Sequence, residues 1–131
     1  MRHTFKKHER LHGKVTIDSL FLHGNSFFLY PFVFYHQNVP TTDVSPICTV
    51  LFSVSKRKIS HATQRNLVRR RMREAFRKNK HLFYSKITTL TTNNLHLAFV
   101  YVSNEVLKYA TIEKKMVEGV EQITSNYVLS S

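Results

Sequence analysis

The stretch "ICTVLFSVSKRKISHATQRNLVRRRMREAFR", residues 47–77, decides the fold because it joins a strand to a helix through a short basic connection. Residues 47–55 form an almost continuous run of apolar and small residues, which is typical of a buried strand. Residues 62–79 have the spacing of a helix, which we expect to end near Asn79. A further apolar run at 95–102, "LHLAFVYV", predicts a strand that is covered on both faces. The helix therefore connects two strands and can form a βαβ crossover.

On the N-terminal side of this stretch, residues 16–22 carry apolar side chains at i, i+3 and i+4, which predicts a short helix. Gly24 follows, and we expect it to take the left-handed C′ position that ends the helix. The aromatic segment "SFFLYPFVFYHQ", residues 26–37, favours strand. Pro31 cannot donate a ladder hydrogen bond, so it marks an edge, a bulge or a break between two strands.

On the C-terminal side, Thr111 is expected to cap a last helix. The apolar residues of that helix follow helical spacing: Ile112, Met116, Val120, Ile123 and Tyr127. This order of elements predicts an α+β sandwich, with helices packed on one central mixed sheet. We expect a single domain of residues 1–131, in which residues 1–14 form a basic and flexible arm.

The charge of the chain indicates a polyanionic partner. Lys and Arg number 20 against 8 Asp and Glu, and the whole excess of +12 lies in residues 1–81. Nucleic acid is the first candidate, and an anionic membrane surface is a distant second. No apolar run is long enough to span a bilayer, and the basic start of the chain, residues 1–10, is not followed by the apolar segment of a secretory signal. A single cysteine, Cys48, in an apolar run reads as a buried hydrophobe and fits a reducing, cytoplasmic location.

The arginine-rich helix divides into two sides when its residues are placed at 100° intervals. The core side carries Val68, Met72, Ala75 and Phe76, while the neighbouring side carries Asn66, Arg69, Arg70, Arg73 and Arg77. Like charges at i, i+4 destabilise an isolated helix, so this basic side is costly unless a partner supplies the opposite charge. Guanidinium groups suit bidentate phosphate contacts and stacking on bases, which favours RNA.

The pattern Arg65-Asn66-x-x-Arg69-Arg70-x-x-Arg73, which follows a strand ending in "SVSKR", resembles the signature of the protein subunit of bacterial ribonuclease P. The resemblance extends to "ERL" at 9–11, "LFLHG" at 20–24 and "REAFR" at 73–77. It implies an α-β-β-β-α-β-α order, the ribosomal protein S5 domain 2-like fold. It also implies a left-handed βαβ crossover, although about 98% of such crossovers are right-handed.

The resemblance further implies a non-catalytic subunit of a ribonucleoprotein endoribonuclease. The RNA subunit would cleave the 5′ leader from precursor tRNA with Mg²⁺ that the RNA mainly holds, and one protein copy would bind each RNA. By position, the RNA-subunit contacts would be Lys56, Arg57, Arg65, Asn66, Arg69, Arg70 and Arg73, with the Asn66 region assisting metal placement. The leader would lie in a cleft between the first helix and the sheet, lined by Ile17, Phe21 and Tyr35.

This chain departs from the family pattern at a few positions. Arg69 stands where lysine is usual, and Ile17 stands where phenylalanine is common. The segment between "SKR" and Arg65 is one residue longer and lacks a frequent glycine. A general RNA-binding, RNA-chaperone or ribosomal module without a catalytic partner is the alternative.

Catalysis by the chain alone has little support in the sequence. Its few carboxylates are scattered, so no Mg²⁺ site of its own is predicted. Its eight histidines share no local signature, which makes a histidine-dependent ribonuclease the third possibility.

Overall fold

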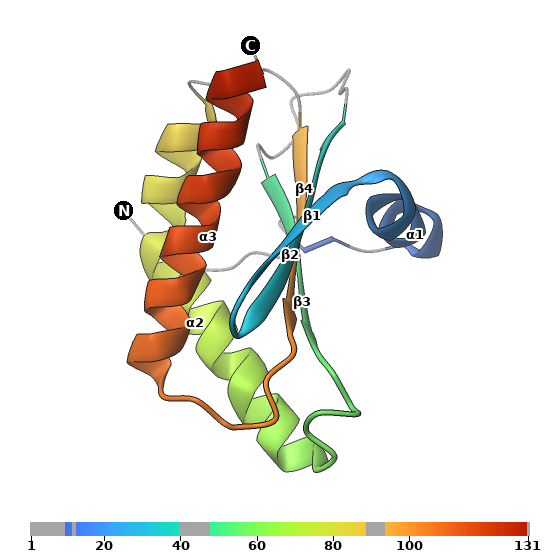
Figure 1. The fold of residues 1–131 in the computed structure, drawn as a ribbon, viewed down its shortest axis with the longest axis vertical. Helices are drawn as coiled ribbons and strands as arrows, with labels where there is room; N and C mark the ends of the chain where they lie inside the picture. The colour runs from blue at the N-terminus through green and yellow to red at the C-terminus, as the bar shows by residue number, and fades with distance from the viewer. Residues whose placement is uncertain (1–9, 12, 40–47, 89–93, 131) are drawn as a thin grey trace.

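The computed structural model describes residues 10, 11, 13–39, 48–88 and 94–130. The elements follow one another in this order (Figure 1): α1 (Lys14–His23), β1 (Asn25–Leu29), β2 (Phe32–Val39), β3 (Cys48–Val54), α2 (Ala62–Thr88), β4 (Asn94–Tyr101) and α3 (Tyr109–Ser130). This is the predicted α-β-β-β-α-β-α order, and the α+β class is confirmed. The tight turn between β1 and β2 contains a cis Tyr30–Pro31 peptide bond, so Pro31 marks a break between two strands.

The four strands form one mixed sheet in the order β1-β2-β4-β3. β2 pairs antiparallel with β1 and with β4, while β3 and β4 run parallel and are joined through α2. In Figure 1 the chain descends β3 at the rear of the sheet, rises through α2 and descends β4 nearer the viewer. The crossover is therefore left-handed, as the resemblance implied.

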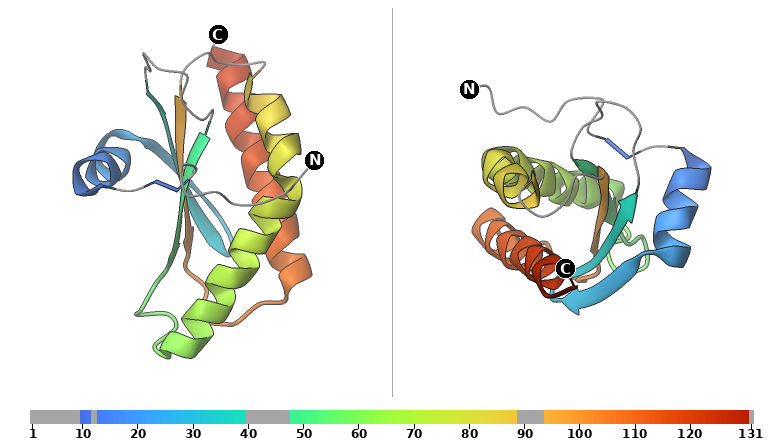
Figure 2. Two further views of the ribbon diagram at one scale, coloured as in Figure 1. Left: turned by 180° about the vertical axis from the view of Figure 1, so that it is seen from behind. Right: turned by 90° about the horizontal axis from the view of Figure 1, so that it is seen from above.

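Helices cover the two faces of the sheet unequally. Figures 1 and 2 show α2 and α3 side by side on one face and α1 alone on the other. Alternate side chains of β2 point to the α2 and α3 side, where Phe32, Phe34 and His36 are buried. The core side of α2 is the predicted one, since Val68, Met72, Ala75 and Phe76 are fully buried. Cys48 is buried in the same core, as expected.

A smaller core lies beneath α1. Leu11, Leu20 and Ala98 are buried there, and Ile17, Tyr35 and Leu51 pack against them while remaining partly exposed. Burying one side of α1 against the sheet fixes the position of its other residues. The partly exposed side chains beneath α1 are therefore available to contact a ligand.

Helix α2 is longer than the sequence predicted. It continues beyond Asn79 to Thr88, and Phe83 in this extension is buried against Phe76 at a ring separation of 5.8 Å. The expected end near Asn79 was wrong because the side chain of Asn79 does not stop the helix. Its Nδ2 donates to the carbonyl of Ala75 one turn earlier, at 2.8 Å.

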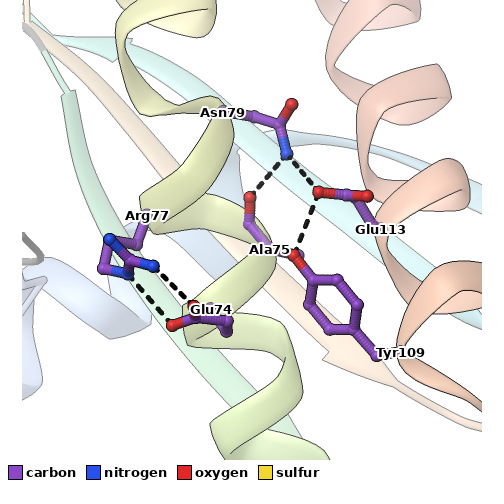
Figure 3. A network of polar contacts seen from close by, with 6 residues as sticks. All are labelled: Glu74, Ala75, Arg77, Asn79, Tyr109 and Glu113. Atoms are coloured by element: carbon purple, nitrogen blue, oxygen red, sulfur yellow. Dashed lines mark hydrogen bonds and ion pairs between the residues drawn. The ribbon is translucent and has the colours of Figure 1, made fainter. Parts of the chain in front are cut away.

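Helix α2 is tied to α3 by a polar network just before this extension (Figure 3). Asn79 Nδ2 and the Tyr109 hydroxyl both donate to Glu113 Oε2, each at 3.0 Å. Burial and the hydrogen bond to Glu113 raise the pKa of Tyr109 to about 12. Lys78 Nζ lies 5.4 Å from the centre of the Tyr109 ring, so the network also contains a cation–π contact. These contacts hold the two helices in register outside the apolar core.

Two predicted helix termini were wrong. Gly24 has φ −74° and ψ 166°, which is extended rather than left-handed backbone. Glycine is required at this position for a steric reason, because a Cβ there would overlap the carbonyl oxygen of Leu20 and crowd that of His36. Thr111 lies inside α3, which begins at Tyr109, so it is not the N-cap.

The end of the predicted flexible arm belongs to the fold. Arg10 forms a parallel bridge with Val50 of β3, and the N–H of Leu11 donates to the Val50 carbonyl at 2.9 Å. Helix α1 already begins at Lys14. Residues 1–9 and 12 lie outside the described part of the chain.

Candidate nucleic-acid interface

One side of α2 carries cationic groups that the fold does not use. Arg70 and Arg73 are exposed and make no hydrogen bond or ion pair with any residue that the structure describes. Arg69 is partly exposed, and its Nη1 donates to Asn66 Oδ1 at 2.9 Å. Asn66 therefore orients Arg69 within this side of the helix. These are four of the five residues that the helical spacing placed together, and the fifth is Arg77.

Arg10 joins this basic side although the sequence analysis did not assign it a contact. The bridge to β3 brings it to a small cavity of about 120 Å³, lined by Arg10, Leu11, Val50, Leu51, Phe52 and Arg73. Partial burial lowers the pKa of Arg73, and the positive charges of Arg10 and Arg69 lower it further. Three cations thus converge where a phosphate group would relieve their repulsion.

Sequence spacing gave no sign of this convergence, since Arg10 and Arg73 are far apart in the chain. The only indication was the "ERL" segment at 9–11, which belonged to the resemblance and had no assigned role. Pairing of that segment with the edge of β3 is what places Arg10 beside α2.

Three other arginines of α2 bond to the protein itself. Arg65 Nη1 donates to the carbonyls of Ile59 and Ser60 at 2.9 and 2.7 Å, which fastens the loop before the helix. Arg71 Nη1 donates to the Leu107 carbonyl at 2.6 Å. The Arg65 contact with RNA stays a prediction, and its guanidinium has a structural partner already.

The third of these, Arg77, forms an ion pair with Glu74. The hydrogen bond from Arg77 holds the pKa of the Glu74 carboxyl below its usual range. The predicted contacts Lys56 and Arg57 lie in an exposed turn two residues beyond β3, beside the start of α2. This turn extends the basic side of α2 toward the end of the sheet.

The three residues predicted to line a leader cleft do lie together on the α1 side of the sheet. The rings of Phe21 and Tyr35 meet edge to face, with centroids 4.6 Å apart and planes at 72°. Phe21 is 36% exposed, so part of its ring surface is open to a ligand. Ile17 packs beside Tyr35 and is also partly exposed. Open aromatic faces of this kind can stack on unpaired bases.

A separate groove of about 330 Å³ runs along the other flank of α1. Its lining residues are Val15, Thr16, Ser19, Gln37, Asn38, Val39 and His96. Burial lowers the pKa of His96, so the neutral imidazole is favoured there. The groove is uncharged and its surface is mainly apolar, unlike the basic side of α2.

The described residues do not form a metal centre. They contain no group of three histidine, cysteine or acidic side chains placed to hold a metal ion. Asn66 is an exposed amide beside Arg69, and a Mg²⁺ site needs several oxygen ligands and usually a carboxylate. These residues therefore do not fit a Mg²⁺ ion held by the protein alone. In the described part of the chain, no helix is long and apolar enough to cross a membrane.

Comparison with known proteins finds one family. The family model "Ribonuclease P" matches residues 5–124. A ribonuclease P protein component from Porphyromonas gingivalis is 31% identical over 92% of this chain and 86% of its own length. A second, from Chlorobium phaeobacteroides, is 40% identical over 63% of this chain and 58% of its own length.

Solved structures agree in fold. The ribonuclease P protein from Thermotoga maritima superposes with a TM-score of 0.65 at 18% identity, covering 87% of this chain and 96% of that one. The protein from Staphylococcus aureus gives a TM-score of 0.61 at 19% identity, covering 88% of this chain and 94% of that one. The sequence match is therefore supported by a common arrangement of helices and strands.

Proposed function

The chain belongs to the ribonuclease P protein family, and from that premise we propose that it binds the RNA subunit through α2 and the 5′ leader of precursor tRNA beneath α1. Membership of the family makes it a protein subunit of a ribonucleoprotein endoribonuclease that acts in tRNA processing. Beyond this, we propose that the chain captures the leader and helps the RNA subunit to use Mg²⁺. A cytoplasmic location, one protein per RNA and the single-domain organisation stay predictions.

The observation that carries the proposal is the separation of two surfaces on one sheet. Helix α2 and Arg10 present cations at the β3 edge, which suits the phosphates of a folded RNA. The α1 side presents partly exposed aromatic rings, which suit the bases of a single strand. A general RNA-binding module would need only the first surface.

The protein would contribute charge rather than chemistry. Cations at the interface would screen repulsion between the RNA subunit and its RNA substrate, so less Mg²⁺ would be required. Mg²⁺ supplies the hydrolytic chemistry when the RNA subunit holds it. Arg69, Arg70 and Arg73 would neutralise phosphates, while Phe21 and Tyr35 would hold the leader in place.

Reconstitution with the matching RNA subunit tests the proposal. At low Mg²⁺, the chain should increase 5′ processing of a precursor tRNA over the RNA alone. Tyr35→Ala should weaken the complex with long-leader substrates and spare leaderless tRNA. Absence of any gain over RNA alone would overturn the proposed function. Cleavage by the protein alone, lost on substitution of a histidine, would indicate an autonomous ribonuclease instead.

A further inference from the structure

Strand pairing arranges the side chains beneath α1 in rows that cross the sheet. One row consists of Leu51, Ala98, Tyr35 and Ser26, which are direct neighbours across β3, β4, β2 and β1. Helix α1 packs over this row, because Leu51, Ala98 and Tyr35 contact its apolar side. The row two residues nearer the hairpin turn consists of Ser53, Val100, Val33 and Phe28. We refer to these four residues as the outer row.

The outer row is open at its β1 end. Phe28 is 64% exposed there, whereas the other three members are partly buried. Its neighbours Phe27 and Leu29 point to the opposite face, where they pack on the main core, and Phe27 stacks on Phe34 at 5.0 Å. The core therefore does not explain a large aromatic residue at position 28. Contiguous exposed apolar surface marks an interaction site, whereas a single exposed apolar residue does not.

Phe28 continues the aromatic surface that Phe21 and Tyr35 begin. Phe28 pairs with Val33 and Ser26 pairs with Tyr35, so Phe28 and Tyr35 are diagonal neighbours on the same face. Diagonal neighbours in an antiparallel pair lie about 7–8 Å apart. Thr16 and Ser19 line the uncharged groove on the other flank of α1, so Phe21 and the outer row belong to the opposite flank.

The charges around the outer row favour nucleic acid as its occupant. The row itself contains no acidic side chain, and its β3 end is followed by the exposed basic turn of Lys56, Arg57 and Lys58. Arg10 and Arg73 lie at the same edge of the sheet. A single strand that leaves this cationic edge would cross the sheet from β3 toward β1. Along that path it would reach Tyr35 before Phe28.

We propose that Phe28 is a second stacking platform for an unpaired leader base, farther from the cleavage site than the base held by Phe21 and Tyr35. The inference rests on the proposed function, because it needs the leader to cross the face beneath α1. Phe28 would set the leader length at which binding stops improving. It would act by contact with a base face, so any base could occupy it.

The test uses the reconstituted complex of the chain and its RNA subunit, with precursor tRNAs of stepwise longer leaders. Phe28→Leu keeps an apolar side chain and removes the aromatic face, while Phe28→Tyr keeps that face. Leu22→Ala is the matched control, since Leu22 is a 76% exposed apolar residue of α1. We expect Phe28→Leu to weaken binding about five- to tenfold for long leaders and to leave short leaders unchanged. Phe28→Tyr and Leu22→Ala should bind all substrates like the parent chain.

A fluorescent base placed at successive leader positions supplies a second measurement. Stacking on Phe28 should quench 2-aminopurine at one position beyond the position that responds to Tyr35→Ala, and Phe28→Leu should abolish only that quenching. Equal loss for every leader length would show a structural role and overturn the inference. A shift in oligomeric state with unchanged leader dependence would assign Phe28 to contact with a second copy, and would overturn it as well.

The proposed function and this inference can fail separately. If Tyr35→Ala weakens long-leader substrates while Phe28→Leu does not, leader binding stands and the second platform is wrong. If neither variant shows leader dependence, both the leader assignment and the second platform are wrong.

Discussion

The arginines of α2 fall into two groups according to what they already contact. Arg65 and Arg71 donate to backbone carbonyls, and Arg77 pairs with Glu74, so these three stabilise the fold. Arg70 and Arg73 have no such partner among the described residues. Helical spacing predicted which arginines share a side of the helix. It could not predict that the protein itself uses Arg65 and Arg71, because their partners come from loops.

The second group should determine the salt dependence of RNA-subunit binding. Replacing Arg69 and Arg73 together by alanine removes two phosphate contacts. Each lost contact should reduce the slope of log affinity against log salt by about 0.7–0.9. Filter binding at several KCl concentrations measures that slope, with Lys114→Ala as the control because Lys114 is an exposed cation of α3. An unchanged slope in the double variant would argue against the basic side of α2 as the interface.

A buried histidine should make the fold sensitive to mild acid. Burial lowers the pKa of His36 below 6.5, so below that pH the unfolded chain binds more protons than the folded one. The contribution of neutral His36 to stability should therefore be fully present above about pH 6.5. It should be lost as the pH falls toward the lowered pKa. The free energy of unfolding of His36→Gln should therefore decrease less than that of the parent chain between about pH 7 and about pH 5.

Urea unfolding at each pH measures this effect. His23→Gln is the control, because His23 is exposed at the end of α1. His96 contributes in the same direction, since its pKa is also lowered by burial, and it accounts for the acid sensitivity that remains. Parallel pH profiles for the parent chain and His36→Gln would contradict the prediction.

At the scale of elements, the sequence predicted each helix and strand but not all of their ends. Apolar periodicity located the core side of α2 and of α3 because it reflects burial against the sheet. It failed at the C-terminal end of α2, where Phe83 is buried beyond a run of polar residues. It also missed the pairing of Arg10 with β3, since one paired residue leaves no periodic pattern. Contacts between residues that are far apart in the sequence determine both the end of α2 and the position of Arg10.

Helix α3 packs on β2 through Gly119. At this position we expect Gly→Ala to destabilise the protein, although the same change usually stabilises a helix. In an open helix position, Gly→Ala is stabilising by about 0.8–1 kcal/mol. At Gly119 a Cβ would overlap the ring of Phe34, which is fully buried and held by Phe27, Phe32 and Phe99. Gly119→Ala should therefore destabilise the fold by about 1–3 kcal/mol, as overpacking does.

Thermal or urea unfolding shows whether Gly119→Ala stabilises or destabilises the protein. Ser125→Ala, at an exposed position of the same helix, should be neutral or slightly stabilising. If Gly119→Ala also stabilised the protein, α3 would lie farther from β2 than the structure shows. Retention of the native circular-dichroism spectrum in both variants would show that the fold itself is unchanged.

At the scale of the whole molecule, physical argument from the sequence could not predict the handedness of the β3–α2–β4 crossover. The general rule favours the right-handed form, and only the family resemblance indicated the left-handed one. The presence of a basic side and an aromatic face was partly predictable, because the charge excess and the aromatic segment are visible in the sequence. The exposure of Phe28 was not, since strand register decides which rings of an aromatic segment lie outside the core.

The charge of the whole chain predicts that salt acts oppositely on folding and on binding. With 20 basic and 8 acidic residues, the compact state suffers self-repulsion, most of all where Arg10, Arg69 and Arg73 converge. Raising KCl from about 0.1 M to about 1 M shortens the screening length from about 10 Å to about 3 Å. The free energy of unfolding should therefore increase over the range in which RNA-subunit affinity falls. Urea unfolding and filter binding in the same buffers measure the two trends.

The double variant Arg69→Ala with Arg73→Ala separates this repulsion from any general effect of salt. Removing two of the three converging charges should raise stability at low salt and should make the salt-dependent gain smaller than in the parent chain. Lys114→Ala removes one charge elsewhere and should leave most of the gain intact. A parent chain whose stability is constant or falls with KCl would show that these cations are balanced within the protein. The basic side of α2 would then no longer require an RNA to explain it.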